Sequence, residues 1–285
     1  MIAVTAASGH LGRLVIDSLS KKIPPPEIVA AARNPQKVAD IASKGVVVRE
    51  ADYSKPDTLA RAFTGVDKLL LISGSEVGRR VEQHKAVIAA AKQAGVKLVL
   101  YTSLLHADRS PLLLREEHLQ SEAAVRASGM PFVLLRHSWY NENYTGAIAQ
   151  AVKLGAHYGA AGEGRISAAS RADYADAAVA VLTSKDNHGG RTYELAGDDG
   201  FTLAQFAAEI ARQSGKPVRY ENLPEAEYKA VLVKAGLPEP VAGFLANTDT
   251  GISKGALYDD SRQLSKLIGR PTTPISRTIA AALAS

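Results

Sequence analysis

The 285-residue sequence predicts an α/β fold, a doubly wound parallel sheet with a smaller C-terminal α/β lobe. Three observations lead to this prediction. Short β-rich runs alternate with helical patterns in the first half, a glycine directly precedes four of the later strands, and the alternation stops after Arg136. Strand, helix and glycine repeating in this order indicate right-handed βαβ units, whose parallel sheet is covered by helices on both faces.

The β-rich runs have the length and the Val, Ile, Leu and Ala content of buried parallel strands. In chain order they cover residues 2–5, 28–32, 46–50, 68–72, 98–103 and 132–136. Apolar residues at helical spacing lie between them, in two stripes formed by Leu11, Leu14, Val15 and Leu19, and by Val81, Ile88, Ala91 and Ala94. The glycines that should end helices in the left-handed conformation, directly before a strand, are Gly45, Gly65, Gly95 and Gly129.

The regular alternation of strands and helices is absent from the second half, which predicts the smaller lobe. Residues 137–164 are rich in Tyr, Asn and Gly and indicate a long loop with one helix near 145–153. Further helices are expected at 171–183, 202–214, 224–235 and 238–247, and a strand at 192–195. Thr202 and Gln205 form a capping-box pattern. We expect a dinucleotide-binding core at 1–136 and a substrate-side lobe at 137–285, with residues 165–196 returning to the core.

The composition excludes several classes of protein. The absence of cysteine excludes disulfides, thiolate catalysis and Cys-ligated metals. The N-terminus lacks the basic and apolar regions of a signal peptide, and no apolar run reaches the roughly 20 residues that span a bilayer, so we expect a cytoplasmic protein without membrane insertion. The charge of +5 is scattered, with Lys21-Lys22 and Arg79-Arg80 as its densest pairs, which favours an anionic small ligand over nucleic acid. The oligomeric state is left open.

A glycine-containing turn after the first strand predicts dinucleotide binding. Gly9 lets the backbone approach a pyrophosphate, Gly12 lets the helix pack close to the sheet, and the helix N-terminus supplies N–H groups to the phosphates. With the surrounding alternation, this indicates a Rossmann-type fold. Ala6 stands at the first position of the expected Gly-x-x-Gly-x-x-Gly, where alanine is tolerated only if its φ stays negative.

Arg33 predicts NADPH as the cofactor. In NAD enzymes an acidic residue near the end of the second strand binds the adenosine ribose hydroxyls. Here residues 28–39 contain no Asp or Glu, and Arg33 stands where a guanidinium binds a 2′-phosphate. Asp52 is a candidate either for the adenine amino group or for capping a helix that begins near Pro56.

Several runs together resemble the NmrA-like, atypical short-chain dehydrogenases, and among them the bacterial NADPH:quinone reductases and the related triphenylmethane reductases. They cover nearly the whole chain, at 4–12, 33–35, 51–53, 69–78, 101–108, 139–144, 170–174 and 265–269. The resemblance implies NADPH contacts from Ala6, Ala7, Ser8, Gly9, His10, Leu11, Arg33, Ser73, Gly74, Ser75, His137, Ser138, Trp139, Tyr140, Asn141, Glu142 and Arg171. The sequence departs from the pattern at Ala6 and at His137-Ser138, where the quinone reductases have Asn-Gly, a loop expected beside the nicotinamide.

The proton relay of ordinary short-chain dehydrogenases is absent from the sequence. That relay is a Tyr with a Lys four residues later, and none of the ten tyrosines has Lys at that position. A quinone can accept hydride with the protein mainly positioning its ring, because the resulting anion is delocalised and takes a proton from water. The sequence therefore predicts reduction of quinones or similar planar acceptors without flavin. A non-catalytic NADP(H)-sensing regulator and a reductase of triphenylmethane dyes are the alternatives.

Three weaker patterns have competing interpretations. Glu116-Glu117-His118 suggests a metal site, but no second histidine follows at the fourth position, which favours a solvated helix face. Ser103 either binds substrate or ends a strand. Trp139 and Tyr140 either form an aromatic wall for a planar substrate, which their place beyond the sheet's carboxyl edge favours, or pack in a core.

Overall fold

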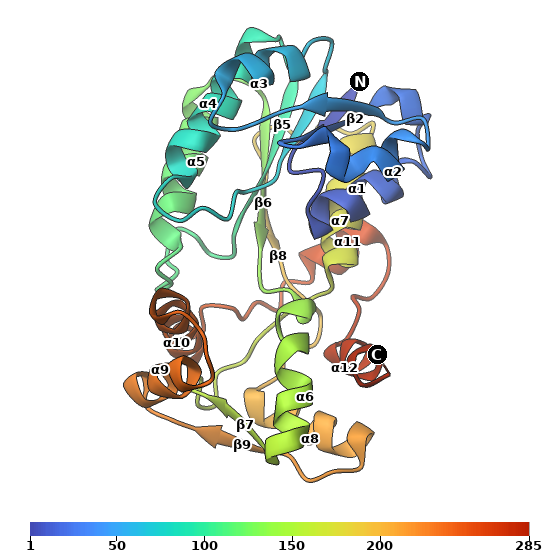
Figure 1. The fold of residues 1–285 in the computed structure, drawn as a ribbon. Helices are drawn as coiled ribbons and strands as arrows, with labels where there is room; N and C mark the ends of the chain where they lie inside the picture. The colour runs from blue at the N-terminus through green and yellow to red at the C-terminus, as the bar shows by residue number, and fades with distance from the viewer. Residues whose placement is uncertain (285) are drawn as a thin grey trace. The chain divides into compact units, whose positions relative to one another are not determined.

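Seven strands form one sheet in the computed structural model, which describes residues 1–284, in the order β3-β2-β1-β4-β5-β6-β8 (Figure 1). Neighbours from β3 to β6 pair in parallel. The strands are β1 Ile2–Val4, β2 Ile28–Ala32, β3 Val47–Glu50, β4 Lys68–Leu71, β5 Leu98–Leu104, β6 Phe132–His137 and β8 Thr192–Leu195. The predicted Rossmann-type α/β fold is confirmed, and each predicted strand is present to within one residue at either end.

The first compact unit contains the helices that cover this sheet; it consists of residues 1–107, 116–137 and 171–193. Helices α1 (His10–Leu19) and α7 (Arg171–Thr183) pack together on one face. On the other face lie α3 (Pro56–Ala62), α4 (Arg80–Gln93) and α5 (Arg115–Ala127) (Figure 1). A short α2 (Ala39–Ala42) precedes β3, and 3₁₀ turns lie at Pro25–Glu27 and Pro35–Val38.

Alternate strand residues supply the core under α3, α4 and α5. Its members on the strands include Ala3, Val29, Leu69, Leu71, Val99, Tyr101 and Leu134, all buried. Gly45, Gly65, Gly95 and Gly129 all have positive φ, from 73° to 87°, as predicted for helix ends directly before strands.

The second unit consists of residues 108–115, 138–170 and 194–285. Its helices are α6 (Thr145–Leu154), α8 (Leu203–Ser214), α9 (Glu225–Lys234), α10 (Glu239–Ser253), α11 (Gln263–Ile268) and α12 (Ile275–Leu283), with a 3₁₀ turn at Asn141–Asn143. Strands β7 (Ala156–Gly159) and β9 (Arg219–Asn222) pair in parallel. The predicted capping box of Thr202 and Gln205 is confirmed at the start of α8.

Two predictions for the second half are wrong: the expected loop at 137–164 contains β7, and α10 continues six residues beyond Asn247. Strand β9 and helices α11 and α12 were not predicted. The extension of α10 has poor helix propensity, but tertiary contacts support it. Asp249 accepts a hydrogen bond of 2.9 Å from the Ala160 amide, and Gly251 packs so closely on Leu112 that a Cβ would lie 2.3 Å from its side chain.

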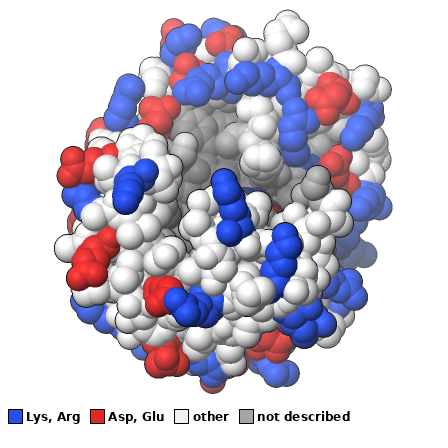
Figure 2. All heavy atoms as spheres, turned by 60° about the horizontal axis from the view of Figure 1, so that its bottom comes forward, with Lys and Arg blue, Asp and Glu red and all other residues white. Residues whose placement is uncertain are grey.

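Charged side chains of both signs lie on the face shown in Figure 2. On the face shown in Figure 2, Lys and Arg side chains are spread among neutral residues and accompanied by Asp and Glu, without gathering into one stripe. No helix within residues 1–284 is long and apolar enough to cross a membrane.

Candidate cofactor-binding site

The turn between β1 and α1 has the geometry of a phosphate-binding loop. Gly9 is the N-cap of α1, and no side chain of the described residues caps this helix. A Cβ on Gly12 would lie 2.5 Å from the Ala6 carbonyl oxygen, so only glycine allows the helix to start this close to the strand. The N–H groups of the first turn are therefore available to a phosphate, and the dipole of a ten-residue helix points at it.

Ala6 contradicts one expectation. Its φ is +49°, in the left-handed region, whereas the sequence argument required a negative value. The tertiary contacts of the turn hold it there: the Ala7 amide donates to the Ala31 carbonyl at 3.1 Å, and the Gly9 amide donates to the Ala6 carbonyl at 2.9 Å. The left-handed conformation costs an alanine about 1–2 kcal/mol, which these contacts offset.

The segment after β4 faces the same sheet edge. Strand β4 lies beside β1, although β3 precedes it in the chain, so the strand order reverses between β1 and β4. The loops after β1 and β4 flank this point, which is the usual ligand position in such sheets. Side chains of neighbouring elements hold the backbone of this segment: the Ile72 amide donates to Thr5 Oγ1 at 3.0 Å, and the Ser73 amide donates to Thr102 Oγ1 at 2.9 Å.

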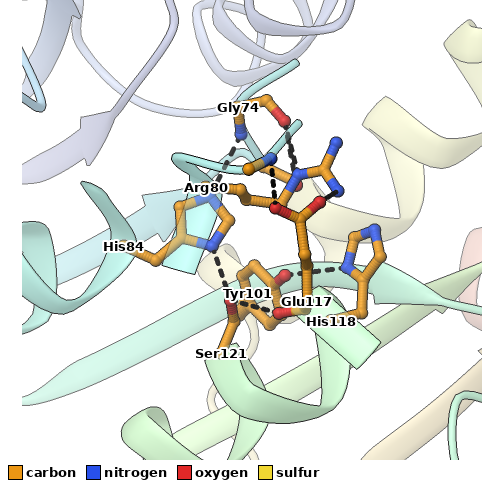
Figure 3. A network of polar contacts seen from close by, with 9 residues as sticks. Gly74, Arg80, His84, Tyr101, Glu117, His118 and Ser121 are labelled. Atoms are coloured by element: carbon orange, nitrogen blue, oxygen red, sulfur yellow. Dashed lines mark hydrogen bonds and ion pairs between the residues drawn. The ribbon is translucent and has the colours of Figure 1, made fainter. Parts of the chain in front are cut away.

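Helices α4 and α5 hold the rest of this segment through a polar network (Figure 3). Arg80 Nε donates to the Gly74 carbonyl at 2.8 Å, and its Nη1 contacts Glu117 Oε2 at 2.6 Å. The other carboxylate oxygen of Glu117 accepts the Gly78 amide at 2.7 Å. At the opposite end of the network, the Gly74 amide donates to His84 Nε2 at 3.1 Å.

His84 can accept this bond because its imidazole is neutral. Burial, and then the charge of Arg80, lower the pKa of His84 to about 3. Its Nε2 accepts, so Nδ1 carries the proton and donates to Ser121 Oγ at 2.9 Å, and Ser121 donates in turn to the Glu117 carbonyl at 2.8 Å. The side chains of His84 and Ser121 therefore form a chain of hydrogen bonds that ends at the Gly74 amide.

The prediction of a solvated face at Glu116-Glu117-His118 is wrong for two of the three residues. Glu117 binds Arg80, and His118 is buried with its Nδ1 2.8 Å from Tyr101 Oη. Within residues 1–284, no group of His, Cys, Asp and Glu has the arrangement of a metal site.

Arg33 lies at the end of β2, as predicted, but with a partner that sequence reasoning missed. Its side chain is 71% exposed, and Nη1 lies 3.1 Å from Glu76 Oε1. Glu76 belongs to the segment after β4, 43 residues away, and is itself 39% exposed. The run of residues 69–78 in the family resemblance was the one signal that could have drawn attention to Glu76.

Known proteins share both the sequence and the fold of this chain. Residues 6–185 match the family model described as NAD(P)H-binding. The chain belongs to this NAD(P)H-binding family. Over 279 residues it is 53% identical to Quinone oxidoreductase 2 of Escherichia coli, covering 98% of this chain and 97% of that protein.

Two solved structures of the family superpose on nearly the whole chain. The NADPH-dependent quinone oxidoreductase of E. coli, complexed with NADPH, has a TM-score of 0.97 and 52% identity over 99% of this chain and 100% of that one. Citrobacter sp. triphenylmethane reductase has a TM-score of 0.95 and 38% identity over 100% and 99%. The predicted resemblance to bacterial NADPH:quinone reductases and triphenylmethane reductases is confirmed.

Asp52 does not cap a helix in this family member. Helix α3 has Lys55 as its N-cap, without a side-chain hydrogen bond, and Asp52 Oδ1 instead accepts the Ser54 amide at 3.0 Å. The capping alternative is wrong, while the contact of Asp52 with adenine stays a prediction.

Ser103 has a structural role in the first unit. Its hydroxyl donates to Glu122 Oε1 at 2.6 Å, and Glu122 binds the Arg136 guanidinium through two contacts of 2.8 Å. All three side chains are buried. A hydroxyl committed to this ion pair favours the interpretation of Ser103 as a strand residue over substrate binding.

His137 is buried against α7. Its ring stacks on Tyr174 with centroids 4.4 Å apart, and burial lowers the pKa of His137 to about 3, so the imidazole is neutral. Arg171, the first residue of α7, is half-buried. Their predicted contacts with NADPH stay predictions.

The predicted residues Ser138, Trp139, Tyr140, Asn141 and Glu142 lie in the second unit. Ser138 Oγ donates to the Leu257 carbonyl at 3.1 Å, and Asn141 Nδ2 donates to the Thr273 carbonyl at 3.0 Å. Trp139 lies 6.5 Å from the Phe244 ring, centroid to centroid. Tyr140 forms a β-bridge with Ala169, and Glu142 lines an open hollow beside α6 and α12. These contacts fix the backbone of 138–142 within its own unit.

Proposed function

We propose that this protein is an NADPH-dependent reductase that transfers hydride to quinones or similar planar acceptors, without flavin. The observation that carries the proposal is its 53% identity to Quinone oxidoreductase 2 across 98% of the chain. The geometry of the first unit supports it, because an uncapped helix N-terminus, an exposed arginine after β2 and a fixed loop after β4 flank one sheet edge.

Different residues at this sheet edge are assigned to different parts of the cofactor. The amides of residues 10 and 11 would bind the pyrophosphate, Arg33 would bind the 2′-phosphate, and residues 73–75 would position the part of the cofactor that leads to the nicotinamide. NADPH supplies the hydride. The acceptor takes up that hydride and one proton from water, which turns a quinone into a hydroquinone. The protein's task is to orient the acceptor ring, which can lower the barrier by several kcal/mol.

A turnover assay tests this function. Purified protein should be colourless and should oxidise NADPH when benzoquinone is added. Tight NADPH binding with no turnover of benzoquinone or of a triphenylmethane dye would instead support the sensing regulator. Turnover of the dye alone would favour the dye reductase.

No tyrosine should act as an essential acid. Tyr101 is fully buried, its hydroxyl contacts buried His118, and burial raises its pKa above the ordinary value. Burial likewise raises the pKa of Tyr144 well above 10. We expect Tyr101→Phe, Tyr140→Phe and Tyr144→Phe each to keep kcat within a few-fold. Loss of a true general acid costs about 10²–10⁴-fold, so a thousandfold fall in kcat with intact NADPH binding would overturn this mechanism.

A further inference from the structure

Glu76 places a carboxylate against the arginine that the proposed function assigns to the 2′-phosphate. Oε1 of Glu76 lies 3.1 Å from Arg33 Nη1, and Oε2 lies 3.7 Å from Arg79 Nη1. Gln83 Nε2 donates to the same Oε2 at 3.0 Å. The carboxylate is therefore held by two guanidinium groups and one amide, on the solvent side of the loop.

The loop cannot carry Glu76 away from this position without breaking its anchors. Gly74 is bound by Arg80 and His84 on one side of Glu76, and Gly78 is bound by Glu117 on the other (Figure 3). The side chains of Arg80 and Glu117 are only 6% and 17% exposed, so their ion pair is well shielded. When Arg33 turns toward a ligand, Glu76 stays beside it.

A carboxylate in this place has opposite effects on the two nicotinamide cofactors. A ribose 2′-hydroxyl can donate a hydrogen bond to this carboxylate. In NAD enzymes it donates in the same way to an acidic residue at the end of the second strand. A 2′-phosphate is repelled by it, while Arg33 and Arg79 attract the phosphate. Residues 28–39 lack any acid, whereas the neighbouring loop after β4 places the Glu76 carboxylate beside Arg33.

We propose that Glu76 is the acidic residue of the adenosine ribose site and that, opposed to Arg33, it limits the preference for NADPH over NADH. This inference rests on the proposed function, since it requires Arg33 to bind the 2′-phosphate. It assigns cofactor choice to a pair of residues: Arg33 favours the phosphate, and Glu76 favours the hydroxyl.

Glu76→Gln tests the proposal because it removes the charge and keeps the size. The dissociation constant for NADPH should fall roughly three- to tenfold, since a like charge beside the phosphate is lost. The dissociation constant for NADH should rise about two- to fivefold, since the charge-assisted acceptor is lost. Fluorescence titration measures both constants, and 2′,5′-ADP against ADP repeats the comparison without the nicotinamide half.

Glu82→Gln is the matched control. Glu82 is an exposed residue of α4 that pairs with Lys85 at 2.9 Å, so this variant makes the same change in net charge away from Arg33. Equal shifts for NADPH and NADH in Glu76→Gln, or shifts no larger than those of Glu82→Gln, would overturn the inference. Arg33→Ala distinguishes a failure of this inference from a failure of the proposed function. If Arg33→Ala lowers the preference for NADPH and Glu76→Gln leaves that preference unchanged, the proposed function stands and the role of Glu76 is refuted.

Discussion

Replacing Arg33 by alanine is expected to weaken NADPH binding roughly ten- to a hundredfold and to leave NADH binding nearly unchanged. Hydrogen bonds to a charged phosphate contribute roughly 1.5–3 kcal/mol, which corresponds to this change in affinity. The side chain is 71% exposed and its ion pair with Glu76 lies at the surface, so its removal should not disturb the fold. Fluorescence titration with both cofactors measures the effect.

Arg33→Lys is the informative companion variant. A lysine keeps the charge but loses the planar fork that binds a phosphate through two N–H groups, so it should retain only part of the NADPH affinity. Equal weakening of NADPH and NADH in Arg33→Ala would remove Arg33 from the 2′-phosphate site. An unchanged NADPH constant at low ionic strength, where charge effects are largest, would do the same.

The half of the fold that could be predicted is the half with strong periodicity. Buried parallel strands such as β2 are apolar runs, and glycines with positive φ end the helices before β3, β4, β5 and β6. Strands β7 and β9 carry no such signal. Each has four residues of mixed polarity, and they pair across about 60 positions of sequence, so only tertiary contacts define them.

In the candidate site, too, the local features could be predicted from the sequence and the long-range contacts could not. The turn around Gly9 and Gly12 is local, and a local pattern of strand, glycine and helix identifies it. The anchors of the loop after β4 come from distant helices. Glu117 stands 39 positions from Gly78, in a charged run that reads as a solvated face, and only the packing of α5 beside α4 reveals its role. The ion pair of Arg33 with Glu76 could not be predicted for the same reason, since 43 positions separate the two residues.

The protonation states of the buried histidines could not be predicted from the sequence either. His84 precedes Lys85 and His118 follows Glu117, and such charged neighbours suggest exposure. In the fold both are buried, and the pKa of each is lowered to about 3. Sequence alone cannot assign His84 as a neutral acceptor for Gly74, because its tautomer is fixed by Ser121 and Gly74 together.

Gly9→Val is expected to abolish NADPH binding while the protein remains folded. Gly9 has φ −79° and ψ 163°, an extended conformation that any residue adopts, so valine does not strain the backbone. A Cβ there would lie 3.3 Å from the Ala6 carbonyl oxygen, a tight contact that a small shift relieves. The rest of the branched side chain would occupy the space where a pyrophosphate meets the helix N-terminus.

Gly12→Val is the contrasting variant, since its Cβ would lie 2.5 Å from the same oxygen and 2.9 Å from Ala7 Cα. We therefore expect Gly12→Val to lower the Tm as well as cofactor affinity, whereas Gly9→Val should keep a native circular dichroism spectrum. Loss of two charge-assisted hydrogen bonds to the pyrophosphate should raise the dissociation constant of Gly9→Val by roughly a hundredfold or more. NADH should be lost together with NADPH, because both cofactors carry the pyrophosphate. A natively folded Gly9→Val protein that binds NADPH normally would show that the phosphates lie elsewhere.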